Sequence, residues 1–354
     1  MRYKPVRGNS ASVGLMEAVL NCFTRDGALY LPEHFPVIPR AFFNNIADMS
    51  LQEIGYVVTN MLFGEDLPSE TIKNVTDKAL SFPVPLSRIS ENEFTLDLTQ
   101  GPTRNYNDIG ARVLAEMFKQ HPNRNHCNMI VTASTGTLSA IAEAFHDIPN
   151  VTTFAIYPSG ELSPNRREHL LNYGKSVVPV EVSGTLRECR SIVRDLFTDH
   201  ELRDTLRLIS GNSANIAILL PRVIFFFYAY ARLRQLNLPL EKVVIAIPTR
   251  NFGNLTSALI ANRMGLPVSR FIAVNPDGAD PEFISDIRLA SLHGTASAAQ
   301  IYSPANNPLS ADEICLRLEA ERPLDHNPRQ TAHRSVTHIS PSVIALKRII
   351  QSKS

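Results

Sequence analysis

Beyond about residue 86, the pattern of hydrophobic and polar positions is typical of an α/β protein. Short apolar runs predict buried strands, and longer stretches with apolar residues three to four positions apart predict helices between them. The expected strands are Met129–Val131, Val151–Tyr157, Ser176–Val182, Lys242–Ile247 and Val268–Val274. Strands separated by helices of this length indicate parallel pairing with helical crossovers. Any ligand site is therefore expected at the carboxyl edge of the strands.

The most apolar part of the chain is Ile216–Leu233, inside an expected long helix Ala214–Leu236. It contains Pro221 and Arg222 and is short for a membrane span, so the pattern predicts a buried helix. Two shorter helices are expected before it, at Pro164–Tyr173 and Leu186–Phe197. After Pro276 the periodicity weakens. The expected elements there are a helix over Pro281–Ser291 and a short last helix over Val343–Ile350.

The first 85 residues differ from the rest because helical patterns dominate them. Helices are expected near Pro39–Ala47, Ser50–Phe63 and Ser69–Ser81, after a turn and short strand in Asp26–Pro32. Ser50 and Glu53 have the spacing of a capping box, whereas Ser69 has an apolar residue at that distance. The helix start at Ser50 is therefore the better supported one.

Composition narrows the class of protein. Of 354 residues, 44% are hydrophobic and 19% charged, with a net charge of +1 and no cluster of basic residues. This excludes an electrostatic case for binding nucleic acid or an anionic membrane. The chain start carries no apolar signal core, so a cytoplasmic protein is expected. No metal site is expected, and the cysteines predict buried or idle thiols; they are Cys22, Cys127, Cys189 and Cys315.

The stretch from Asp97 to Ala111, DLTQGPTRNYNDIGA, stands out chemically. An alternating apolar run ends there, a Gly-Pro turn follows, and a helical pattern begins. Such a strand, turn and helix start form a common platform for a cofactor site. We therefore take Thr103, Asn107 and Asp108 as candidate residues of a ligand cleft.

Two further loops follow expected strands. Ser134, Thr135 and Thr137 lie at a helix start, where hydroxyls either cap the helix or bind a carboxylate. The second loop either binds an anion at a helix N-terminus or is a plain turn capped by Asn. Its residues are Arg250, Asn251, Phe252, Gly253 and Asn254.

Several strings together resemble the threonine synthase family. YKPVRG, RDGALYLPE, GPTRNYND, NSAN and NFG occur in the family's order, over roughly residues 1 to 310. The resemblance implies an α/β fold of the tryptophan-synthase-β-like type, pyridoxal phosphate (PLP) fold type II. Two open parallel sheets in two lobes would follow a mainly helical N-terminal lobe. The expected division is 1–85 for the N-terminal lobe, 86–322 for the core (its first lobe about 100–210), and 323–354 for a shortened tail.

The chain departs from the family pattern at functional positions. Asn107 stands where the family has the lysine that holds PLP as an imine, and an amide cannot form that bond. Arg250 replaces a glycine of the family's phosphate loop, and Glu161 replaces a cation. The string beginning at Thr331, TAHR, resembles the family's contact to the pyridine nitrogen. Asn251 to Asn254 would be what remains of the phosphate loop.

Three functions were weighed. The favoured hypothesis is a threonine-synthase-like pseudoenzyme, leaning to no enzyme activity, that binds a protein partner or a small anionic ligand. The alternative is an enzyme of amino-acid or specialised-metabolite biosynthesis with altered chemistry in the same cleft. An active threonine synthase, a carbon–oxygen lyase that converts O-phosphohomoserine to threonine and phosphate, ranks last. In the favoured reading there are no catalytic residues, and no cofactor is expected because Asn107 removes the imine.

Overall fold

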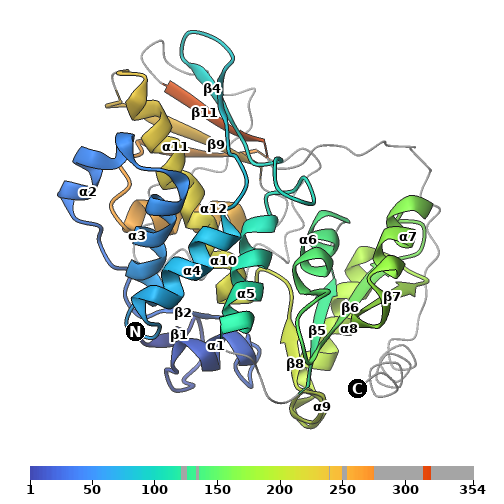
Figure 1. The fold of residues 1–354 in the computed structure, drawn as a ribbon. Coiled ribbons are helices and arrows are strands. Elements are labelled where there is room, and N and C mark those ends of the chain that lie inside the picture. The colour runs from blue at the N-terminus through green and yellow to red at the C-terminus, as the bar shows by residue number, and fades with distance from the viewer. Residues whose placement is uncertain (121–125, 133–134, 239, 249–252, 275–313, 320–354) are drawn as a thin grey trace.

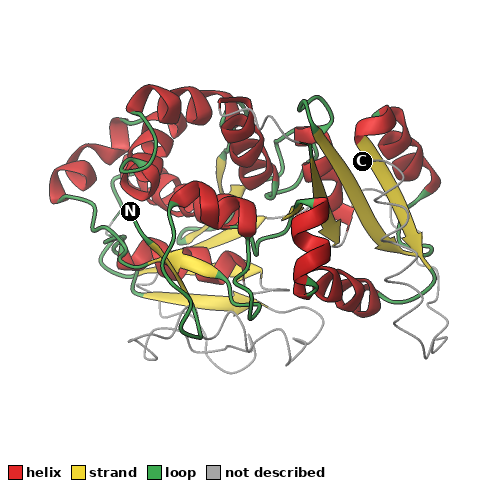
Figure 2. Ribbon diagram, turned by 90° about the horizontal axis from the view of Figure 1, so that it is seen from below, coloured by secondary structure: helices red, strands yellow, loops and turns green. Residues whose placement is uncertain are grey.

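The computed structural model describes residues 1–120, 126–132, 135–238, 240–248, 253–274 and 314–319. These residues form two lobes around the two larger sheets, and the mainly helical N-terminal region, which holds a small two-stranded sheet, contacts both lobes (Figure 1). Figure 2 shows the two sheets as distinct groups of strands, each flanked by helices. The predicted α/β fold with two parallel sheets is confirmed. The expected helix over 281–291 and the tail 323–354 lie outside the described residues, and the proposed domain boundaries stay predictions.

One sheet has the strand order β7-β6-β5-β8, and each of its neighbouring pairs is parallel. Every side chain of β5 and β6 is buried, which explains why these strands read as continuous apolar runs. The sequence did not predict β8 or the helix before it, because three strand residues give no periodic signal. The elements of this lobe are β5 (Cys127–Thr132), α6 (Thr135–Phe145), β6 (Val151–Pro158), α7 (Pro164–Asn172), β7 (Val177–Val182), α8 (Leu186–Thr198), α9 (His200–Leu206) and β8 (Leu208–Ser210).

The second sheet has the order β10-β9-β11-β4-β3, parallel except for the β3–β4 pair. β11 lies at its centre, where Leu316 aligns with Phe94 on one side and Ile245 on the other. The sequence pattern does not predict this strand, which lies in a stretch without clear periodicity. The elements of this lobe are β3 (Leu86–Arg88), β4 (Glu93–Asp97), α5 (Asp108–Gln120), β9 (Val243–Pro248), α12 (Gly253–Arg263), β10 (Arg270–Val274) and β11 (Ile314–Glu319).

The N-terminal region is mainly helical, as expected. The predicted capping box is present: the backbone N–H of Glu53 donates to Ser50 Oγ at 3.2 Å, and Ser50 N–H donates to Glu53 Oε2 at 2.8 Å. Helix α4 has no side-chain cap, in line with the weaker signal at its start. The elements here are β1 (Tyr3–Pro5), α1 (Leu15–Asn21), β2 (Tyr30–Pro32), α2 (Arg40–Asn45), α3 (Leu51–Phe63) and α4 (Ser69–Ala79).

The expected long helix Ala214–Leu236 is wrong as one continuous element. It is divided into α10 (Ile216–Leu219), a 3₁₀ turn (Leu220–Arg222) and α11 (Val223–Gln235). Pro221 lies in the turn, and proline removes a helical donor and clashes with the preceding turn. The run Ile216–Gln235 is long and apolar enough to span a membrane, but 89% of its most apolar window is buried inside the protein. It is therefore a core helix with a break, and the break places Arg222.

The described cysteine side chains agree with the prediction of idle thiols. Cys22, Cys127 and Cys189 are free and buried. Burial raises the pKa of Cys127 and Cys189 to about 11 in each case, so both stay protonated thiols near neutral pH. No group of three or more metal-ligating side chains is present in the part of the chain that the structure describes.

Candidate functional site

The loop between β4 and α5 is folded around the Asp108 carboxylate. Thr103 donates to it twice, from its backbone N–H at 3.0 Å and from its hydroxyl at 2.5 Å. A Cβ on Gly101 would lie 2.4 Å from Asp108 Oδ2, so only glycine lets the loop come this close. Burial raises the pKa of Asp108, against the opposing effect of the Thr103 hydrogen bonds. Thr103 and Asp108, both predicted to line a cleft, therefore bind each other and hold the loop.

Asn107 is the centre of a buried polar cluster. Asn105 Oδ1 accepts its backbone N–H at 2.9 Å and its side-chain amide at 2.6 Å. The same amide donates to Thr137 Oγ1 at 3.1 Å. Arg222 Nη2 donates to Asn107 Oδ1 at 2.8 Å. The structure thus brings two predicted site residues together, Asn107 and Thr137, and adds Arg222, which the sequence analysis did not assign to the site.

The cluster joins the two lobes. Asn107 directly precedes α5, Thr137 lies in the first turn of α6 in the other lobe, and Arg222 ends the 3₁₀ turn. Figure 1 shows α5 and α6 facing each other where the lobes meet. A Cβ on Gly110 would lie 2.4 Å from the carbonyl oxygen of Ile218. This close approach of α5 and α10 brings residues 219–222, called the Arg222 segment below, against the start of α5.

Arg222 is unusual because it is 2% exposed and has no acidic partner among the described residues. Its guanidinium carbon lies 5.1 Å from the centre of the Tyr106 ring. Its Nε and Nη1 atoms are buried and have no hydrogen-bond partner. Burial lowers the pKa of Arg222, and Tyr106 opposes this only in part. An arginine beside a proline within the most apolar run is the sequence signal that could have found it.

The predicted phosphate loop leads into α12. Gly253 and Asn254 are buried at the start of this helix. The helix contacts the Arg222 segment, because Ser257 Oγ donates to the carbonyl oxygen of Leu219 at 3.1 Å. Thr135 begins α6, but its side chain is not among the described ones. Other predicted site residues also lie outside the described residues: Ser134, Arg250, Asn251, Phe252 and Thr331.

The NSAN string, Asn212 to Asn215, has a structural role in this chain. Asn212 Nδ2 donates to the Thr132 carbonyl oxygen at 2.7 Å, and its Oδ1 accepts the Thr132 N–H at 3.1 Å. Asn215 caps α10 by accepting the Ala217 N–H at 3.0 Å, and its amide donates to the Val19 carbonyl. These contacts fasten the end of β5 and the N-terminal region to the core.

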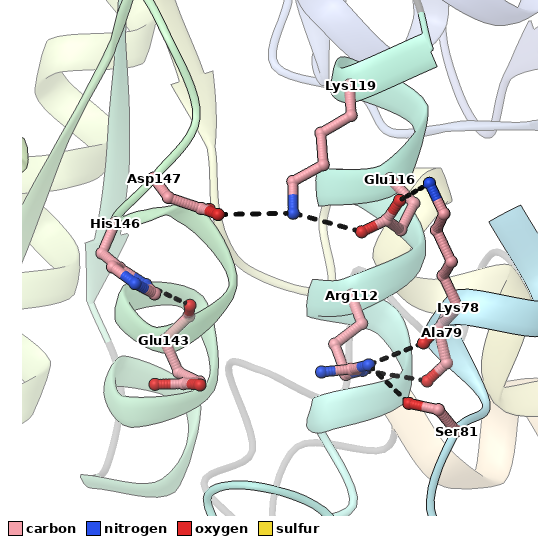
Figure 3. A network of polar contacts seen from close by, with 9 residues as sticks. All are labelled: Lys78, Ala79, Ser81, Arg112, Glu116, Lys119, Glu143, His146 and Asp147. Carbon is pink, nitrogen blue, oxygen red and sulfur yellow. Dashed lines mark hydrogen bonds and ion pairs between the residues drawn. The ribbon is translucent and has the colours of Figure 1, made fainter.

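No described lysine lies at the Asn107 cluster. All six lysines in the described residues have exposed side chains, whereas an imine-forming lysine is held desolvated at its cofactor. Lys119 is near the end of α5, about 18 Å along the helix axis from Asn107, which directly precedes α5. There it pairs with Glu116 at 3.2 Å and Asp147 at 3.6 Å (Figure 3).

Comparison with known proteins shows which proteins this fold and site resemble. The paired parallel sheets define an α/β protein of PLP fold type II. Residues 2–80 match the family model described as "Threonine synthase N terminus". Threonine synthase of Haemophilus influenzae is 32% identical over 276 residues, which are 77% of this chain and 63% of the relative. That of Escherichia coli is 28% identical over 320 residues, 90% of this chain and 74% of the relative.

Solved structures agree. The crystal structure of Escherichia coli threonine synthase has a TM-score of 0.73 at 28% identity, covering 81% of this chain and 67% of that one. PLP-bound threonine synthase from Brucella melitensis has a TM-score of 0.68 at 29% identity, covering 77% and 60%. Over most of its length the chain is similar to threonine synthases. It spans about two thirds of the length of these relatives, from 60% to 74%.

These findings correct two expectations. The pseudoenzyme hypothesis is wrong, because the relatives are threonine synthases at substantial identity and support a threonine-synthase-like function. The expectation of no cofactor is wrong as well, because a relative of 29% identity is PLP-bound. Both errors came from giving the departures from the family pattern, Asn107 above all, more weight than the similarity over the rest of the chain. Asn107 removes one covalent bond, yet the cluster around it is a hydrogen-bonded junction between the lobes.

Proposed function

We propose that this chain is a threonine-synthase-like enzyme of amino-acid biosynthesis that uses PLP. Two observations support this: the similarity to threonine synthase over most of the chain, and the buried hydrogen-bonded cluster around Asn107, which stands where the family's PLP-binding lysine would be. By resemblance the reaction is that of a carbon–oxygen lyase, in which O-phosphohomoserine and water give threonine and phosphate. The expected cytoplasmic location and the division at residues 85 and 322 belong to the same proposal.

Within this family the chain is a diverged member, because Asn107 occupies the position of the imine-forming lysine. A carboxamide nitrogen does not form an imine with an aldehyde, so PLP is held here by non-covalent contacts. The buried N–H groups of Arg222 without partners fit an anionic group of the cofactor or substrate. The buried start of α12, with Gly253 and Asn254, fits a phosphate as other helix N-termini do.

The roles of the other residues follow from their contacts. When bound, PLP supplies the electron sink that the chemistry of amino acids at Cα needs. Asn107 orients the Arg222 guanidinium through its side-chain oxygen. The Thr137 hydroxyl, which accepts from Asn107, holds the second lobe against this group. By resemblance, Thr331 would be the residue that contacts the pyridine nitrogen of PLP.

Adding PLP to the purified chain, removing unbound cofactor by gel filtration and treating with borohydride tests the proposal. We expect retained PLP, no pyridoxyl adduct on any lysine by peptide mass spectrometry, and PLP-dependent phosphate release from O-phosphohomoserine. Absence of both retained PLP and phosphate release would contradict the enzyme proposal. A borohydride-fixed adduct on a lysine would contradict non-covalent binding while leaving the family function intact.

A further inference from the structure

Arg222 carries a buried positive charge without a neutralising partner in the described residues. A guanidinium has five N–H groups, and within the described part of the chain only Nη2 has a hydrogen bond, to the neutral amide of Asn107. Burying a charge that is neither paired nor fully hydrogen-bonded is strongly unfavourable. Such an arrangement is expected where a bound ligand supplies the missing charge.

The nearby acidic side chains in the described residues do not neutralise Arg222. Asp108 follows Asn107 in the sequence, but its carboxylate accepts two hydrogen bonds from Thr103 and packs against Gly101. Glu116, two turns further along α5, pairs with Lys119 and Lys78. The Tyr106 ring stacks on the Arg222 guanidinium through its face and supplies no negative charge.

The surroundings of Arg222 favour a small anion with oxygen atoms. Asn107 and the Tyr106 ring hold the guanidinium in place, which leaves Nε and Nη1 as oriented donors. Asn107 also links Arg222 to Thr137, in the first turn of α6. A hydroxyl and a helix start beside a buried cation suit phosphate or carboxylate oxygens.

We propose that Arg222 binds a small oxyanion, the phosphate or carboxylate of an amino-acid ligand or its cofactor, at the junction of the two lobes. Arg222 thereby brings a positive charge to the position where the family's lysine would stand. Asn107 acts as its positioning residue. The ligand class rests on the proposed function, whereas anion binding by Arg222 is testable with simple probes.

Thermal unfolding of the full chain, followed with increasing concentrations of probe anions, tests this proposal. Inorganic phosphate reports on phosphate binding and L-threonine on carboxylate binding, with chloride at equal ionic strength as the reference. Arg222→Gln removes the charge and keeps a donor for Asn107, while Arg222→Lys keeps the charge. Arg232→Gln is the matched control, since Arg232 also stacks on a tyrosine of α11, with its guanidinium carbon 4.8 Å from the Tyr228 ring centre.

The expected result is that phosphate or threonine raises the melting temperature of the wild type and of Arg232→Gln. Arg222→Gln should bind the same probe on the order of tenfold to a hundredfold more weakly, the loss of a charge-assisted hydrogen bond. Arg222→Lys should retain part of the effect. Without ligand, Arg222→Gln should melt no lower than the wild type, because it removes an unpaired buried charge.

Two results would overturn the inference. One is equal stabilisation of the wild type and Arg222→Gln by both probes. The other is a ligand-free Arg222→Gln that melts well below the wild type while retaining its response to anions, which would make Arg222 purely structural. Either result could occur with PLP retention and phosphate release intact, so failure of this inference is distinguishable from failure of the proposed function.

Discussion

The positive charges at the two ends of helix α5 differ in burial and in pairing. At its C-terminal end, Lys119 is exposed and pairs with Glu116 and with Asp147 of the other lobe (Figure 3). At its N-terminal end, Arg222 is buried against Asn107 and lacks an acidic partner among the described residues. Both ends connect the lobes, but only at the N-terminal end is there a buried charge that no described acidic residue compensates.

The difference separates a structural contact from a candidate binding site. An exposed ion pair is weak and screened by salt, so it adds little to stability and indicates no ligand. A buried cation without a partner is costly, and a chain that keeps one is expected to use it. One end of α5 is therefore held to the other lobe by an ion pair, and the proposed anion-binding residue, Arg222, packs against the opposite end.

The largest effect is expected from Asn107→Lys. Its ammonium would lie beside the buried Arg222 guanidinium, and two unpaired cations at one buried site should lower the free energy of unfolding by about 3 kcal/mol or more. Urea denaturation measures this loss. The double variant Asn107→Lys/Arg222→Gln should recover a large part of it, because only one cation then remains. A single variant as stable as the wild type would show that Arg222 does not make this site cationic.

Gly110→Ala should separate the start of α5 from the Arg222 segment. The added Cβ would meet the Ile218 carbonyl oxygen, a backbone atom that cannot move away cheaply, so we expect a loss of about 2 kcal/mol. Gly55→Ala is the matched control: its Cβ would meet a terminal methyl group of Leu80, which can shift. Equal urea midpoints for the two variants would contradict the close contact of α5 with α10.

Asp108 should give a smaller, pH-dependent effect. Burial raises its pKa, so its contribution to stability is fully present below the ordinary aspartate value of about 3.9 and is lost as pH rises through the raised value. The stability of the wild type relative to Asp108→Asn should therefore fall as the pH is raised from about 4 toward neutrality. Urea unfolding across this range measures it, with the exposed Asp147→Asn as control. A relative stability that rises with pH would contradict the assignment.

The smallest effect is expected from Lys119→Gln. Lys119 and Asp147 are exposed, and the buried Glu116 keeps Lys78 as a second partner at 3.8 Å. The loss should therefore cost less than about 1 kcal/mol and should shrink in 1 M salt. Lys73→Gln, which removes the exposed pair with Asp77 on α4, is the control for an ion pair within one helix. If Lys119→Gln lowers the free energy of unfolding by several kcal/mol, the contact between the lobes at Lys119 contributes more than a surface ion pair.

Much of the fold was predictable because local patterns carry it. The runs that became β5, β6 and β9 are buried on both faces, and Ser50 with Glu53 marked the start of α3. β8 and β11 were missed because a short strand has no sequence signal of its own until it pairs with its neighbours. Pro221 was visible in the sequence, yet the break it causes was not predicted, since proline is sometimes tolerated within a long helix.

By itself, the sequence determined the family resemblance, the two-sheet α/β fold, the loop from Gly101 to Asp108 and the absence of a lysine at Asn107. Only the tertiary structure decided what surrounds Asn107. Arg222 is 115 residues away in the chain, and its contact with Asn107 depends on the packing of α5 against α10. A local pattern shows which residue types are present, whereas burial and partners arise when distant segments pack together. For that reason a position that looked like a lost lysine proved to be the centre of a charged and buried junction.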